Sequence, residues 1–113
     1  MQSPPAFRSL AFREMFLVWA IRIGCSQNVE PGAAEEALEQ AFHLAKVDDA
    51  LRAFRPFADT VVTAWRAAGR APDIHCVCST AVGEDEWRLV QLIAALQDRD
   101  LIRASGCVSD VLP

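Results

Sequence analysis

The amino-acid sequence predicts an all-α fold: a compact small bundle of four to five helices with one structured loop at about residues 70–82. Apolar residues recur at steps of three and four along most of the chain, which is the spacing of one helix face. Acidic residues cluster where these stretches begin, and glycines stand where several of them end, as is typical of helix termini. With 113 residues, the chain has room for a single domain.

The first helix is expected to follow a flexible lead of residues 1–6, to begin near Pro5 and to be closed by Gly24. Neither glycine nor proline occurs in residues 7–23. Between residues 15 and 21 every face of this helix would be apolar, which is the pattern of a helix surrounded by protein. We therefore expect it to be the central helix of the bundle.

A second helix is predicted over about residues 31–46. Pro31 takes the first helical position, where its missing N–H costs nothing, and three glutamates follow in the next turns. Alanines, Leu38 and Phe42 form a single apolar stripe, and the opposite side is charged or polar. This pattern indicates a helix on the surface of the bundle.

The third helix is predicted to start at Asp48, a good N-cap residue, and to end at Gly69. Pro56 interrupts this stretch. Proline cannot donate to the carbonyl four residues back and clashes with it, so a kink or break is expected near Arg55.

The segment of residues 70–82 has no helical period, and it is expected to form a structured loop with one short extended piece. A fourth helix should begin at Gly83, with three acidic residues in its first turn. A short last helix is predicted to run through Ala104 and end at Gly106, which leaves residues 107–113 as a C-terminal tail.

Composition narrows the functional classes. Apolar residues make up 52% of the chain and the mean hydropathy is +0.15, a surplus that points to an oligomer or partner surface. The net charge of -4 and the lack of a basic stretch argue against a nucleic-acid partner.

The run from Met15 to Ile21 is too short to span a membrane, and acidic Glu14 beside it disfavours a signal peptide. We expect a cytoplasmic protein, and the excess of arginine over lysine indicates a GC-rich bacterial genome.

The four cysteines fall at predicted helix ends and in the loop, where metal ligands are commonly mounted. If the first three helices run up, down and up, Cys25 lies at the same pole as the loop that carries Cys76 and Cys78. Cys107 or His75 could then complete a tetrahedral site. The donor set suits zinc, with an iron–sulfur cluster as second choice.

Two other interpretations of these cysteines remain open: unperturbed thiols that pack as small hydrophobic groups, and a redox-active thiol pair. The sequence contains no phosphate-binding loop, zinc-protease helix or nucleophile elbow, so no catalytic residue is predicted and an enzyme is not the default. The leading hypothesis is a small helical protein-interaction or adaptor module that works as a homodimer or with a protein partner. Metal binding is the alternative, and a thiol redox regulator is the third.

Overall fold

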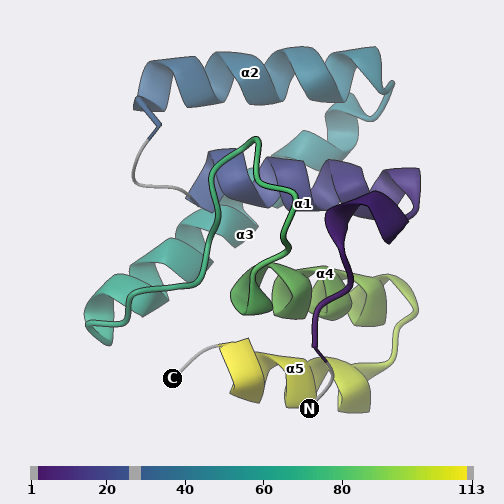
Figure 1. Cartoon of the computed structure of the whole chain (residues 1–113), viewed down its shortest axis with the longest axis vertical. Coiled ribbons are helices and arrows are strands. Elements are labelled where there is room, and N and C mark those ends of the chain that lie inside the picture. Colours follow the sequence, from purple (N-terminus) through teal and green to yellow (C-terminus); the bar gives the residue numbers. More distant parts are fainter. Residues whose placement is uncertain (1–2, 26–28, 112–113) are drawn as a thin grey trace.

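The computed structural model describes residues 3–25 and 29–111 of the chain. These residues form a short 3-10 turn and five α-helices, and no strand occurs among them (Figure 1). After the turn, Phe7–Ser9, the helices are α1 (Phe12–Cys25), α2 (Pro31–Leu44), α3 (Asp48–Ala67), α4 (Glu84–Gln97) and α5 (Leu101–Val111). The all-α prediction is confirmed. None of these helices is long and apolar enough to cross a membrane, within the residues described.

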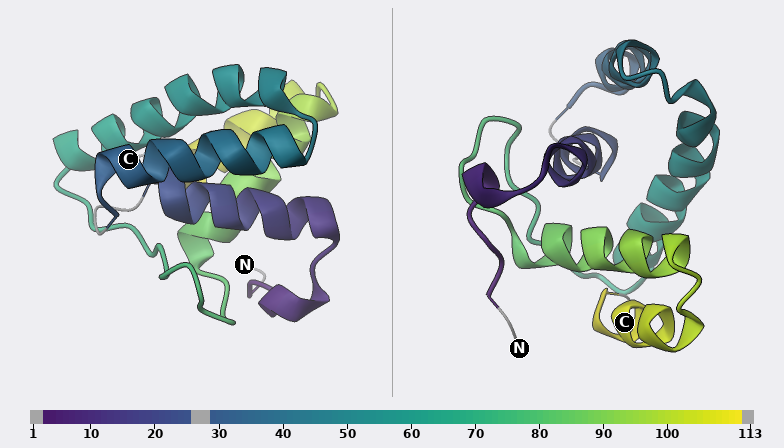
Figure 2. Two further views of the ribbon diagram at one scale, coloured as in Figure 1. Left: turned by 90° about the horizontal axis from the view of Figure 1, so that it is seen from above. Right: turned by 90° about the vertical axis from the view of Figure 1, so that its right-hand side faces the viewer.

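Helix α1 is the centre of the molecule, as predicted. In the right-hand view of Figure 2 it is seen end-on, with α2 above it, α3 to one side, α4 below and the loop of residues 70–82 on the side opposite α3. Three of its side chains, Val18, Ala20 and Ile21, are fully buried. A helix enclosed in this way needs apolar residues on every face, which is what the sequence between residues 15 and 21 provides.

Aromatic residues fill the space between the first three helices. The ring of Phe42 on α2 packs edge-on against Phe16 of α1 with centroids 5.0 Å apart, and lies 5.8 Å from the ring of Phe54 on α3. Trp65 is 2% exposed, whereas Trp19 and Trp87 are only partly buried against the same core. The alternating up, down and up course of α1 to α3 matches the predicted one (Figure 1).

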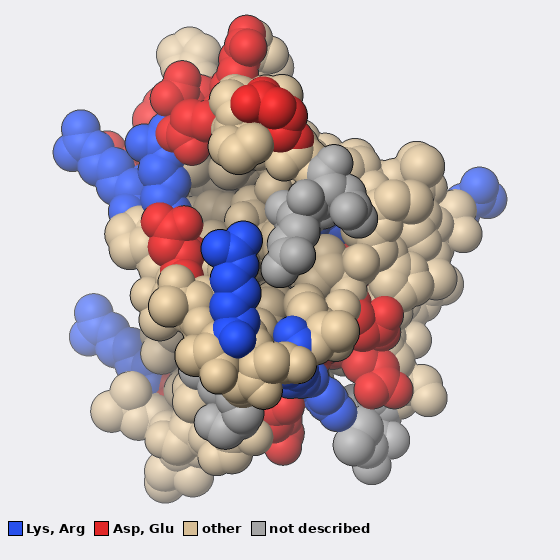
Figure 3. Space-filling view, turned by 90° about the vertical axis from the view of Figure 1, so that its left-hand side faces the viewer, with Lys and Arg blue, Asp and Glu red and all other residues tan. Residues whose placement is uncertain are grey.

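The outer faces of α2 and α3 are joined by opposite charges. Arg55 of α3 contacts Glu35 of α2 and also donates to the Oε1 atom of Glu39 at 3.0 Å. Figure 3 shows this side of the molecule, where acidic side chains gather at the top and basic side chains lie just below them. Both signs are therefore interspersed on this face.

Several predicted helix boundaries are wrong. Helix α1 starts only at Phe12 and continues through Gly24. Of the kink or break predicted near Arg55, the break is wrong, because helix α3 continues through Pro56. The proline is exposed, so its ring lies on the solvent side of the helix, and Thr60 of the next turn donates its hydroxyl to the Pro56 carbonyl at 2.7 Å. Asp48 is the first residue of α3, and the N-cap is Val47.

The predicted tail is also wrong, because α5 continues through Gly106 to Val111. The side chain of Val111 is fully buried, and its carbonyl accepts hydrogen bonds from the indole of Trp65, at 3.0 Å, and from Arg70. Burial of this residue gains more free energy than one glycine in a helix costs, about 1 kcal/mol. Residues 112–113 of the predicted tail, and residues 1–2 of the predicted lead, lie outside the described residues.

Candidate functional site

A buried ion pair joins the central helix to the start of α4. The side chains of Arg22 and Glu86 are 1% and 0% exposed. Nε of Arg22 donates to Oε2 of Glu86 at 2.9 Å, and Nη2 donates to Oε1 at 3.1 Å. Removing two charges from water costs several kcal/mol for each ion, which their mutual attraction offsets only if further hydrogen bonds satisfy the remaining polar atoms.

The loop of residues 70–82 supplies hydrogen-bond acceptors to the arginine. The guanidinium of Arg22 donates to three of its backbone carbonyls, at 3.4, 2.9 and 2.6 Å: those of Val77, Ser79 and Ala81. The loop therefore wraps around the end of this side chain. A charged donor of this kind stabilises a backbone carbonyl more strongly than a neutral one does.

The carboxylate of Glu86 accepts further hydrogen bonds from the loop and from the start of α4. Its Oε1 atom accepts from the backbone N–H of Gly83 at 2.8 Å, which satisfies one of the free N–H groups at the start of α4. Its Oε2 atom accepts from the backbone N–H of His75 at 2.9 Å. With the two bonds from Arg22, this carboxylate accepts four hydrogen bonds, so it fixes the loop, α1 and α4 together.

A second buried carboxylate, Asp85, holds the start of the loop. It is 3% exposed and accepts from Nη2 of Arg70 at 2.5 Å and from the backbone N–H of Asp73 at 2.6 Å. The carboxylate of Asp73 in turn accepts from the N–H of Glu84 at 2.9 Å. The loop is thus ordered by charged side chains, which confirms the prediction that it is structured. The short extended piece predicted in it forms no strand among the described residues.

This framework presents two thiols on the surface. Cys76 and Cys78 are both exposed, and their sulfur atoms lie 3.7 Å apart. The backbone between them forms a tight turn in which the N–H of Ser79 donates to the carbonyl of Cys76 at 3.0 Å. We call residues 76–79 the dithiol turn.

The imidazole of His75 does not face the thiols. Its Nδ1 atom lies 3.1 Å from the hydroxyl of Ser79, and its Nε2 atom lies 3.2 Å from Oδ1 of Asp73. An acid, imidazole and hydroxyl in a row resemble the order of groups in a serine hydrolase. The hydroxyl of Ser79, however, also accepts from the N–H of Ala81 at 3.2 Å, and none of the pockets described below is lined by this loop. We interpret the row as a brace for the loop.

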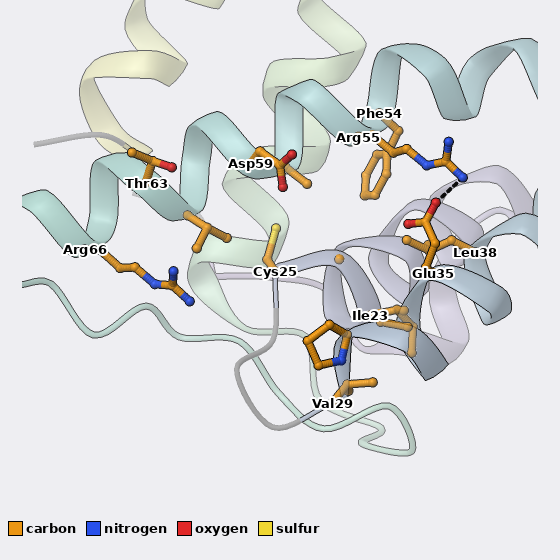
Figure 4. A pocket seen from close by; sticks show the side chains of 15 residues that line it. Ile23, Cys25, Val29, Glu35, Leu38, Phe54, Arg55, Asp59, Thr63 and Arg66 are labelled. Carbon is orange, nitrogen blue, oxygen red and sulfur yellow. Dashed lines mark ion pairs between the residues drawn. The ribbon is translucent and has the colours of Figure 1, made fainter.

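Cys25 lies on the α3 side of α1. It is 4% exposed and lies at the wall of a groove of about 620 Å³ between α1, α2 and α3, which we call the side groove (Figure 4). Burial, and to a smaller extent the nearby carboxylate of Asp59, raises the pKa of the Cys25 thiol to about 12. The thiol is therefore protonated near neutral pH and is a poor metal ligand or nucleophile.

The fourth cysteine, Cys107, belongs to α5. It is half-buried and packs against a small apolar cluster of Leu92, Ala95 and Ala104 between α4 and α5. Of the five predicted ligands, the structure brings together Cys76 and Cys78 and leaves the others elsewhere. Within residues 3–25 and 29–111, no group of three or more His, Cys, Asp or Glu side chains could hold a metal ion.

A different candidate site lies at the end of the molecule where α1 begins, α2 meets α3 and α4 meets α5, on the right of Figure 1. A groove of about 410 Å³ opens there, lined mostly by apolar side chains from four helices: Leu17, Phe42, Ala50, Ala53, Phe54, Phe57, Ile93, Leu96 and Gln97. Six large apolar residues of the adjoining helix ends are exposed: Phe12, Leu44, Val47, Leu96, Leu101 and Ile102. We call the groove and these six residues the apolar end.

Comparisons of the chain with protein-family models, curated proteins and solved structures found no match. The site residues are therefore assigned from geometry alone. Sequence reasoning missed Arg22, Glu86 and Asp85, which order the loop. The available signal was weak: Arg22 looks like the charge that ends an apolar run, and both acids look like ordinary first-turn residues of a helix.

Proposed function

We propose that this chain is a small helical protein-interaction module that associates through its apolar end, and that its partner there is a second copy of itself. The observation that carries the proposal is the exposure of large apolar side chains around an apolar groove. Ile102 is 90% exposed, Leu44 is 81% exposed and Leu101 is 70% exposed. A monomer gains nothing by holding such side chains in water.

The surface area of the chain supports the same proposal. A monomer of 12.4 kDa is expected to expose about 6,100 Å². The chain exposes 7,140 Å². The difference, roughly 1,000 Å², is close to the area of about 800 Å² that each partner buries in a stable interface.

The shape and charge of the apolar end favour a copy of the same chain. A two-fold interface requires one surface to carry both a projection and a hollow that receives it. The projections are Leu101 and Ile102 at the start of α5, and the hollow is the groove, whose lining includes Leu96 and Gln97 at the end of α4. The connection before α5 carries both signs of charge, in Asp98, Arg99 and Asp100, so a two-fold arrangement can pair unlike charges at the rim.

Sedimentation velocity over a wide concentration range tests the proposal. We expect the wild-type chain to reach twice its mass of 12.4 kDa as concentration rises. Replacing Ile102 or Leu44 by glutamate should shift the chain to the monomer, because a buried unpaired charge would be placed in the interface.

A matched control is Val77→Glu, which introduces the same charge at a residue that is 42% exposed but lies on the dithiol turn, away from the apolar end. This variant should associate like the wild type, with an unchanged far-ultraviolet circular dichroism spectrum. A wild-type chain that stays monomeric at all concentrations would contradict the proposal, and so would equal effects of Ile102→Glu and Val77→Glu.

A further inference from the structure

The dithiol turn has no part in the association proposed above. Cys76 and Cys78 lie on the loop beside α1, and their sulfur atoms are 3.7 Å apart and open to solvent. Elsewhere in the chain a free thiol is buried or packed against apolar side chains, as for Cys25 and Cys107. Only this pair therefore offers two accessible sulfur donors at one point, among the described residues.

The backbone that carries the two thiols is fixed in place. The carbonyl of Val77, between them, and that of Ser79, just after them, accept hydrogen bonds from the buried guanidinium of Arg22. The N–H of His75, just before them, is held by the carboxylate of Glu86. Donors that are already close lose little conformational entropy when they bind one ligand, so the turn is preorganised for chelation.

The number and kind of donors select the ligand. Thiolates are soft donors, which favour soft cations over magnesium or calcium. Zinc requires four protein ligands in a closed site, and here the third and fourth are missing from the described residues: the imidazole of His75 is turned to Asp73 and Ser79. Two sulfur donors without a third are instead the complete ligand set of a cation that accepts two-coordinate geometry, as monovalent copper does.

We propose that Cys76 and Cys78 form a two-thiolate site for a soft monovalent cation of the copper(I) class. On binding, each thiol loses its proton to solvent and each sulfur forms one bond to the metal, whose oxidation state does not change. A nearly linear arrangement requires the two sulfur atoms to move further apart than 3.7 Å. Both side chains can do this by rotation about their Cα–Cβ bonds, because both are exposed.

The test is an anaerobic titration of the reduced full-length chain with copper(I) held by the coloured chelator bicinchoninate. We expect one copper(I) to move from the chelator to each chain. Cys76→Ser and Cys78→Ser should each weaken binding by about 100-fold or more, since linking two binding groups raises affinity by roughly 10² to 10⁴. Both residues are exposed, so neither variant disturbs the core.

Cys107→Ser is the matched control, because it removes one partly accessible thiol outside the turn, and Cys25→Ser controls for the buried thiol. Both should bind copper(I) like the wild type. Copper that stays with the chelator would overturn the proposal, as would equal losses in Cys107→Ser and Cys76→Ser.

Discussion

The ion pair between Arg22 and Glu86 makes a quantitative prediction. The carboxylate accepts two hydrogen bonds from the guanidinium and one each from the N–H groups of Gly83 and His75. In Glu86→Gln, one carboxylate oxygen becomes an amide NH₂, and the two donors that faced this oxygen then face another donor. The charge of Arg22 also stays buried without a counter-charge.

Removing one partner of a buried ion pair costs about 3–5 kcal/mol, because the remaining charge is uncompensated. A chain of 113 residues has a total stability of roughly 6–17 kcal/mol. The substitution should therefore remove a large fraction of the stability and lower the melting temperature by about 10 °C or more. An exposed pair should behave differently: Glu39→Gln, at the exposed contact with Arg55, should cost less than about 1 kcal/mol.

Urea unfolding of the two variants, followed by circular dichroism, gives the comparison directly. Hydrogen exchange adds a local measurement, because the N–H of His75 loses its charged acceptor in Glu86→Gln and should exchange faster at a fixed global stability. If Glu86→Gln costs no more than Glu39→Gln, the buried pair does not hold the loop and the reasoning on the dithiol turn loses its basis.

Three further predictions concern Cys25 and two glycines. Folding raises the pKa of the Cys25 thiol from about 9.0 to about 12, so the unfolded chain loses this proton at lower pH than the folded chain. The free energy of unfolding should therefore fall between pH 9 and 12, by up to about 1.4 kcal/mol per pH unit. Cys25→Ser should show a shallower slope in urea unfolding at several pH values; parallel slopes would refute the linkage. Gly106→Ala should stabilise the chain by about 0.5–1 kcal/mol, since nothing lies within 4 Å of the added Cβ in α5. Gly83→Ala should destabilise the chain, because the added Cβ would lie 2.2 Å from the carbonyl oxygen of Asp73. Thermal melts of the two variants test both predictions. If Gly106→Ala lowered the melting temperature more than Gly83→Ala, α5 would end at Gly106, as the sequence predicts.

The fold could be predicted from the sequence because its signals are local. A few neighbouring residues are enough to predict the central helix, from its apolar side chains, and the start of α4, from its acidic first turn. The errors have one feature in common: Gly24, Pro56 and Gly106 are ordinary stop signals for a helix, yet each lies inside a helix of the structure. Gly106 is followed by Val111, whose burial depends on α3.

The candidate sites were less accessible to sequence reasoning. The sequence drew attention to the cysteines, but which of them meet depends on how the loop and the helices wrap around α1. Arg22 and Glu86 are 64 residues apart, and nothing local distinguishes a buried charge from a solvated one. The apolar surplus in the composition predicted an association surface, but it gave no sign that exposed apolar side chains would gather where α1 begins, α2 meets α3 and α4 meets α5.

Because the loop wraps around Arg22, the two thiols come together only as the chain folds. In the unfolded chain, the guanidinium of Arg22 stays solvated, because its counter-charge, Glu86, is far away along the sequence. The loop can close only after α4 has docked on α1, so we expect it to form late and in a single cooperative step. The fixed backbone of the dithiol turn is thus a product of the tertiary fold, and a peptide with the same few residues would not reproduce it.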